Sequence, residues 1–152
     1  GEAKKPSVIV KNSNGDTIKK ALNYSIKYSS GRKNIGIYTV TITFRGKYSG
    51  KTELNFKIKP KKPTLKLSST SSGKATFSWS DVTGESGYEV YYSTKITGNF
   101  TKLNTYKANV TSGSKSNLTS GKRYYFRVRA FTKTANGTVY SSWSTVKNIK
   151  IK

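Results

Sequence analysis

The side chains that could do chemistry in this sequence are aromatic and basic residues interleaved along two segments. Successive side chains of a strand point to opposite faces of its sheet, so the alternation over 88–92 and 124–131 places one set outward: Glu89, Tyr91, Tyr125, Arg127, Arg129 and Phe131. Aromatic rings and arginines in such a row could stack on sugar rings or bases and form bidentate contacts with acidic groups. The candidate ligand face is therefore Tyr91, Tyr125, Arg127, Arg129 and Phe131. Ordinary cross-strand pairing between tyrosine and arginine accounts for the same pattern without a ligand.

Catalysis and metal binding have little support in these residues. The chain contains no His and no Cys, which excludes a Ser-His-Asp triad, a cysteine nucleophile and an ordinary zinc or haem site. A glycosidase needs two carboxylates about 5–9.5 Å apart, whereas the acidic residues are scattered between turns and strand faces: Glu2, Asp16, Glu53, Asp81, Glu85 and Glu89. The stretch 12–16 lacks the later glutamate of a calcium loop and is better interpreted as a turn. We expect no enzyme, no catalytic residue, no cofactor and no metal.

A net charge of +23 predicts attraction to polyanions. The charge is spread along the chain, with 13 basic and 3 acidic residues in 1–60 and 16 and 3 in 61–152. A dedicated nucleic-acid groove would concentrate it, and the basic and aromatic run 123–129 lacks the motif of RNA-binding strands. We therefore expect no specific nucleic-acid binding, and polysaccharide or an anionic cell-wall polymer as the partner. No apolar run approaches the ~20 residues that span a bilayer, so membrane insertion is not expected.

The elements that must position these residues are β-strands, because apolar and polar residues alternate through most of the chain. In 1–60 strands are expected over 7–12, 22–28, 36–46 and 54–59, as parts of a meander of about five strands. The segment 59–63 then interrupts the pattern with two prolines and three lysines. We place one domain over 1–60 and a second over 61–152. The second is expected to form about seven short strands separated by turns, which is typical of a β-sandwich.

Several motifs of the second part resemble those of the fibronectin type III domain. The resemblance covers 63–152 and is carried by Trp79, the strand 87–92, the Leu118-x-x-Gly121-x-x-Tyr124 spacing, the strand 126–130 and the segment 141–144. The leucine, glycine and tyrosine have the spacing of a tyrosine corner, in which the hydroxyl bonds to backbone a few residues upstream. Ser120 stands where the family often has proline. The resemblance implies that Trp79 is a core residue between two sheets.

Residues 1–60 are similar to short immunoglobulin-like repeats of surface proteins from Gram-positive gut bacteria. The residues that carry this likeness are Pro6–Val8, Tyr24–Ile26, Tyr38–Thr43, Gly46–Gly50 and Phe56–Pro60. Such a repeat usually has a further strand before Pro6, so the sequence is expected to begin inside the repeat. The chain begins with Gly1 and shows no leader, so we expect a piece of a longer protein.

Together the two resemblances imply an all-β chain of two tandem β-sandwich domains, immunoglobulin-like and then fibronectin type III-like. They imply a secreted or surface-attached bacterial protein, with neighbouring domains of the same chain as partners and a monomeric state. The expected function is cell adhesion or a structural spacer. The alternative is a carbohydrate-binding accessory module of an extracellular enzyme, with Tyr91, Tyr125 and Phe131 as its platform.

Overall fold

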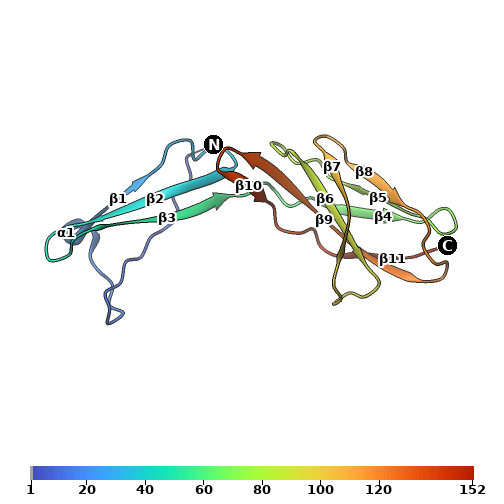
Figure 1. Cartoon of the computed structure of the whole chain (residues 1–152), viewed down its shortest axis with the longest axis horizontal. Helices are drawn as coiled ribbons and strands as arrows, with labels where there is room; N and C mark the ends of the chain where they lie inside the picture. Colours follow the sequence, from blue (N-terminus) through green and yellow to red (C-terminus); the bar gives the residue numbers. More distant parts are fainter. Residues whose placement is uncertain (1) are drawn as a thin grey trace. The chain divides into compact units, whose positions relative to one another are not determined.

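The structure is a computed structural model that describes residues 2–152. Antiparallel strands make up nearly all of its regular structure, which confirms the all-β prediction (Figure 1). The chain divides between Ile58 and Lys59 into two compact units. The assignment of 1–60 and 61–152 as separate domains stays a prediction. Among residues 2–152 no helix is long and apolar enough to cross a membrane.

The first unit is built on one antiparallel sheet with the strand order β1-β2-β3. Its elements are α1 (Lys20–Asn23), β1 (Tyr24–Tyr28), β2 (Gly36–Phe44) and β3 (Lys51–Ile58). The apolar residues of the strands alternate as predicted, so that Ile26 pairs with Ile42 and Tyr38 with Phe56 on one face of the sheet. Val10 and Ile18 from the preceding segment are buried against this face with Tyr24 and Ile42.

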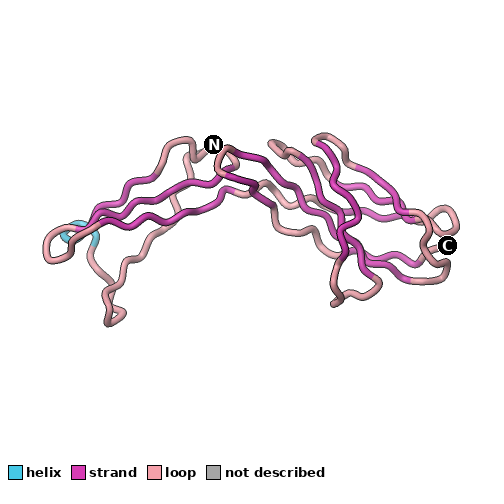
Figure 2. Tube along the Cα trace, in the orientation of Figure 1, coloured by secondary structure: helices cyan, strands magenta, loops and turns pink. Residues whose placement is uncertain are grey.

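The strand expected over 7–12 is not formed, and this prediction is wrong. Residues 2–10 run over the sheet without a ladder of backbone hydrogen bonds (Figure 2), and only Lys11 makes an isolated bridge, with Thr17. Isolated hydrogen bonds hold this segment's backbone instead: the Tyr28 hydroxyl donates to the carbonyl of Pro6 at 2.7 Å, Arg32 Nε donates to that of Lys4 at 2.9 Å, and the amide of Lys4 donates to the carbonyl of Arg32 at 3.0 Å. In the first unit the layer that covers the sheet is therefore an extended segment held by isolated hydrogen bonds and by its buried side chains.

The second unit is a sandwich of two sheets. One sheet has the order β4-β5-β8, and the other has the order β10-β9-β6-β7 with β11 also paired to β9. The bounds are β4 (Leu65–Ser68), β5 (Ala75–Trp79), β6 (Gly87–Ser93), β7 (Thr101–Lys107), β8 (Ser112–Lys115), β9 (Arg123–Thr134), β10 (Gly137–Tyr140) and β11 (Lys147–Lys150). Strand β8 forms in a polar stretch without apolar alternation, and the segment 141–146 separates β10 from β11.

The core of the second unit lies between the inner faces of its two sheets. Phe77 and Trp79 on β5 meet Tyr88 on β6 and Phe126 on β9, with ring centroids 5.4–5.6 Å apart for the Trp79–Tyr88 and Phe77–Phe126 pairs. The placement of Trp79 between the sheets is confirmed by its exposure of 5%. This side of β6 and β9 is thus filled by the core, which leaves their other side for the outward-facing residues.

The predicted tyrosine corner is present at the start of β9. The hydroxyl oxygen of Tyr124 accepts a hydrogen bond of 3.2 Å from the backbone amide of Thr119, five residues upstream. The hydrogen bond to the Thr119 side chain, and then this backbone bond, lower the pKa of the Tyr124 phenol below its ordinary value. The corner fixes the turn that leads into the strand carrying most of the candidate residues.

Removing the hydroxyl of Tyr124 should weaken the second unit modestly. For Tyr124→Phe we expect a loss of about 0.5–1.5 kcal/mol in the free energy of unfolding, because the amide of Thr119 loses its hydrogen-bond partner. Urea denaturation measures the change. The matched control is Tyr125→Phe, since the Tyr125 hydroxyl makes no hydrogen bond within residues 2–152. Equal stabilities for the two variants would contradict a role for the corner.

Candidate functional site

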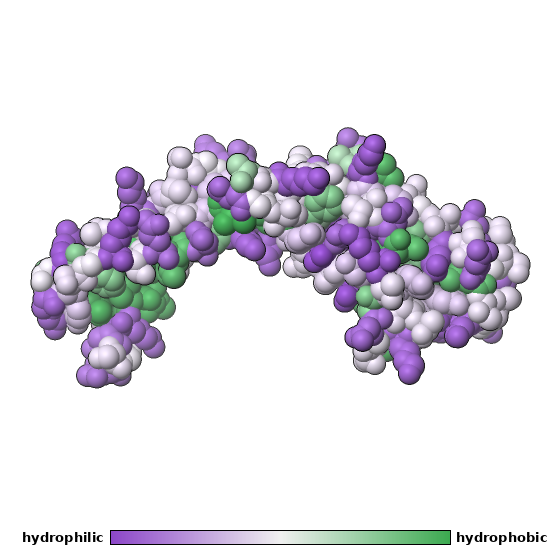
Figure 3. Space-filling model, in the orientation of Figure 1, coloured by the Kyte–Doolittle hydropathy of each residue, from purple (hydrophilic) through white to green (hydrophobic). Residues whose placement is uncertain are grey.

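Strands β6 and β9 carry the predicted ligand face side by side. Tyr91 pairs with Arg127 and Glu89 with Arg129 in the antiparallel register. The alternation read from the sequence therefore places these four side chains on the same outward side. Hydrophilic residues are spread over both units on the side of the molecule drawn in Figure 3, in agreement with the even division of charge along the chain.

Two arginines and three aromatic residues form a continuous column on this face, which we call the arginine–aromatic stack: Phe100, Arg127, Trp143, Arg129 and Tyr140. The Arg127 guanidinium carbon lies 4.3 Å from the ring centre of Phe100 and 4.2 Å from that of Trp143. The Arg129 carbon lies 4.5 Å from the ring centre of Trp143 and 3.7 Å from that of Tyr140. Each guanidinium is therefore attracted by rings on two sides, and each such contact contributes about 0.5–2 kcal/mol.

Trp143 is at the centre of this column, and the sequence interpretation did not assign it to the ligand face. It also contacts Tyr91, with ring centroids 4.9 Å apart in an edge-to-face arrangement. Its loop is fixed to β9 by two buried serines: Ser141 Oγ accepts from the amide of Ala130 and Ser144 Oγ from that of Val128, both at 3.0 Å. The only sequence signal is a pair of serines three positions apart with the tryptophan between them.

Glu89 forms two ion pairs beside the column, one with Arg129 and one with Lys102. Its side chain is 9% exposed, and its Oε2 accepts from Nε and Nη2 of Arg129 at 2.9 and 2.7 Å. Its Oε1 accepts from Nζ of Lys102 at 2.7 Å. Burial alone would raise the pKa of the Glu89 carboxyl, but the bonds from Lys102 and Arg129 outweigh it and hold the pKa below its ordinary value.

Arg127 has no such acidic partner. Its Nε is buried without a hydrogen-bond partner, and its guanidinium donates to no other group within residues 2–152. Burial lowers the pKa of this guanidinium, and the neighbouring charge of Arg129 lowers it further. The two arginines of the stack thus differ: one is neutralised by Glu89, and the other is held only between rings.

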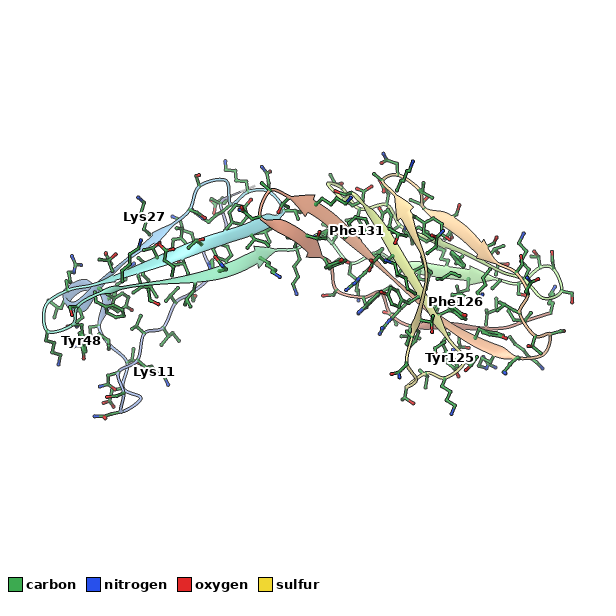
Figure 4. The ribbon with its side chains drawn as sticks, in the orientation of Figure 1. Lys11, Lys27, Tyr48, Tyr125, Phe126 and Phe131 are labelled. Atoms are coloured by element: carbon green, nitrogen blue, oxygen red, sulfur yellow. The ribbon has the colours of Figure 1, made fainter. Side chains whose placement is uncertain are left out.

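The remaining predicted residues lie at opposite ends of β9 (Figure 4). Phe131 is only 8% exposed, and its ring packs against Tyr140 with centroids 6.2 Å apart. Tyr125 is half-buried and has no aromatic partner in the part of the chain that the structure describes. Of the three rings expected to form a platform, Phe131 is covered, Tyr91 contacts Trp143, and Tyr125 alone is unstacked.

The scattered carboxylates are bonded individually rather than gathered. Asp81 accepts from the buried hydroxyl of Tyr88 at 2.7 Å, and Glu85 accepts from the amide of Asn109 at 3.0 Å. Burial, and then the bond to Asp81, raise the pKa of the Tyr88 phenol. Asp16 closes the predicted turn with Asn12. Within residues 2–152 no three acidic side chains come together as metal ligands would.

Comparison with known proteins gives one matching family and several similar solved structures. Residues 59–147 match the family model of the fibronectin type III domain. The FN1–FN3 domains of chicken CNTN1 are similar in structure, with a TM-score of 0.51 and 20% identity over 78% of this chain and 44% of that one. No curated protein matches the sequence.

Two further solved structures are similar over a smaller part of the chain. Pectate lyase PelI from Erwinia chrysanthemi gives a TM-score of 0.47 and 21% identity over 57% of this chain and 27% of that one. A structure described as a myokine gives a TM-score of 0.49 and 18% identity over 60% of this chain and 97% of that one. The chain therefore spans less than half of the length of the CNTN1 and PelI chains.

Proposed function

This chain belongs to the fibronectin type III family through residues 59–147, and from that membership we propose that it is a non-catalytic adhesion or spacer module of an extracellular protein. Fibronectin type III modules are generally non-catalytic and usually extracellular. The finer proposal is a secreted or surface-attached bacterial protein, with an immunoglobulin-like repeat in residues 1–60 and neighbouring domains as partners. The charge of +23 suits an anionic cell envelope.

The observation that carries the proposal is the arginine–aromatic stack. Its rings and guanidinium groups contact one another, and Arg129 is neutralised by Glu89. Contacts of this kind fasten the 141–146 loop to the sheet through Trp143 and so stiffen the outer face of the sandwich. A stiff, internally paired face is what a spacer that transmits force requires, whereas a sugar platform needs open rings.

Mechanical unfolding tests the spacer role. In single-molecule force spectroscopy of the whole chain we expect Trp143→Ala to lower the unfolding force of the second unit, because the loop and both arginines lose their central ring. The control is Tyr140→Ala, which removes an end ring that is 37% exposed and should lower the force less. Equal unfolding forces for the wild type and Trp143→Ala would count against the stack as a stiffening element.

The alternative is a carbohydrate-binding accessory module, which the unstacked ring of Tyr125 favours. Titration calorimetry with neutral polysaccharides separates the two functions. A spacer gives no saturable heat, whereas an accessory module binds and loses binding in Tyr125→Ala. The matched control is Ser78→Ala on the exposed side of β5, in the other sheet.

A purely electrostatic attachment to an anionic polymer makes a separate prediction. By analogy with counterion release, its affinity should fall steeply between about 50 and 200 mM salt. Flat salt dependence would rule out this form of adhesion.

A further inference from the structure

Arg127 is a stacked cation whose hydrogen-bond donors are unused. Arg129, two residues further along β9, stacks on the same Trp143 ring. Its Nε and Nη2 donate hydrogen bonds to Glu89. Arg127 donates to nothing within residues 2–152, and its Nε is buried. A buried donor without a partner costs about 1–3 kcal/mol, and a ligand that accepted a hydrogen bond from this guanidinium would offset part of that cost.

The geometry around Arg127 is that of a prepared anion site. Its guanidinium carbon lies over the rings of Phe100 and Trp143, 4.3 and 4.2 Å from their centres. The ring centre of Tyr91 is 5.8 Å away. Rings on both sides fix the plane of the group, and its N–H donors form no hydrogen bond within residues 2–152. An oxyanion can accept two parallel bonds from the edge of a guanidinium. Because the side chain is already ordered, binding costs little additional conformational entropy.

The surroundings of Arg127 suit an acidic sugar. Tyr125 lies on the same side of β9, about 7 Å along the strand, and its half-buried ring is unstacked. Arg123 follows at the next position on that side and is bonded to Asn148. The nearest acidic residue in the register, Glu89, is already bonded to Arg129 and Lys102. A flat ring beside an unpaired guanidinium matches a sugar ring that carries a carboxylate.

We infer that Arg127 and Tyr125 form a subsite for a uronate residue of an acidic polysaccharide, with the carboxylate on the Arg127 edge and the sugar ring on Tyr125. The inference rests on the proposed adhesive role and deepens it by naming the class of ligand. It differs from general attraction by the +23 surface, because it assigns the contact to one arginine of the 29 basic residues.

The test is a nuclear magnetic resonance titration of the whole ¹⁵N-labelled chain with an alginate hexasaccharide, at about 150 mM salt, where general electrostatic attraction is screened beyond about 8 Å. We expect saturable shifts of the Arg127 Nε–H and Trp143 indole N–H signals, and none with a neutral cello-oligosaccharide of equal length. The Arg127 signal is assigned by its loss in Arg127→Lys.

Two charge-matched variants locate the site. Arg127→Gln should weaken alginate binding at least about tenfold, because a bidentate charged contact is lost. Lys66→Gln on β4 removes the same charge from the other sheet and should have little effect. Arg127→Lys keeps the charge without the fork and should also weaken binding. Thermal denaturation of each variant shows that it is folded at the temperature of the titration.

Three results would overturn the inference: no saturable binding of alginate, equal loss in Arg127→Gln and Lys66→Gln, or unchanged Arg127 signals while other residues shift. Equal affinity for polyphosphate of the same charge would overturn the assignment to a uronate sugar. These outcomes are separate from the spacer role, which fails only if Trp143→Ala leaves the unfolding force unchanged.

Discussion

Trp79→Ala is expected to lower the free energy of unfolding of the second unit by about 3–5 kcal/mol. The indole is 5% exposed and lies between Tyr88 and Tyr106, with ring centroids 5.4 and 5.1 Å away. Alanine leaves a cavity between the two sheets, and the surrounding side chains are fixed on their strands and cannot move far enough to fill it. For a unit of this size the loss is comparable with the whole stability, so this unit should unfold at 37 °C.

Denaturant unfolding followed by hydrogen exchange measures this effect in each unit. Amides of β9 should lose protection, while those of β2, in the first unit, should keep it. Trp79→Phe is the informative control: it keeps most of the ring volume and removes an indole Nε1 that is buried without a hydrogen-bond partner, so it should cost less. A melting temperature like that of the wild type for Trp79→Ala would contradict the role of this residue in the sandwich core.

The second large effect is expected at Glu89. Glu89→Gln should cost about 2–4 kcal/mol, because Arg129 is left as a largely buried cation without its carboxylate. The lower half of that range applies if Lys102, whose side chain is 45% exposed, is hydrated after the substitution. Thermal denaturation at neutral pH measures the loss. Glu53→Gln is the matched control, since its ion pair with Lys51 is exposed on both sides and should matter much less.

The contribution of Glu89 also has a predictable dependence on pH. Because its pKa is held below the ordinary value in the folded chain, the carboxylate stabilises the fold above the ordinary glutamate pKa of about 4.3. This stabilisation is lost as the pH falls through the lowered pKa. The difference in melting temperature between the wild type and Glu89→Gln should therefore be full at neutral pH and shrink in acid. A difference that stays constant down to pH 2 would show that the effect is not electrostatic.

Most of the second unit was predictable because its strands alternate and its turns are marked by glycine. The tyrosine corner could be read from three residues, since its geometry depends on local spacing. The 7–12 segment could not, because Val8 and Val10 look like a strand whether their backbone is paired or only their side chains are buried. The sequence does not reveal that the side chains of Tyr28 and Arg32 donate hydrogen bonds to carbonyls of this segment.

The sequence predicted which side of the sheet the candidate residues lie on, but it did not predict which other side chains pack among them. Alternation placed Tyr91, Arg127 and Arg129 on one side. It did not show that Trp143 would enter between the two arginines, because that residue comes from an irregular segment whose position depends on two serine hydroxyls. Long-range partners of this kind have no local pattern.

The interruption between β10 and β11 also bears on how the module behaves when crowded. An unpaired outer strand invites the edge of another molecule to add to it. Here the outer edge beside β9 consists of two strands of four residues each, separated by a segment in which serine hydroxyls replace backbone groups as acceptors for β9. Such an edge offers no long template for sheet extension, so on this side of the sheet neighbouring modules are less prone to pair through their strands.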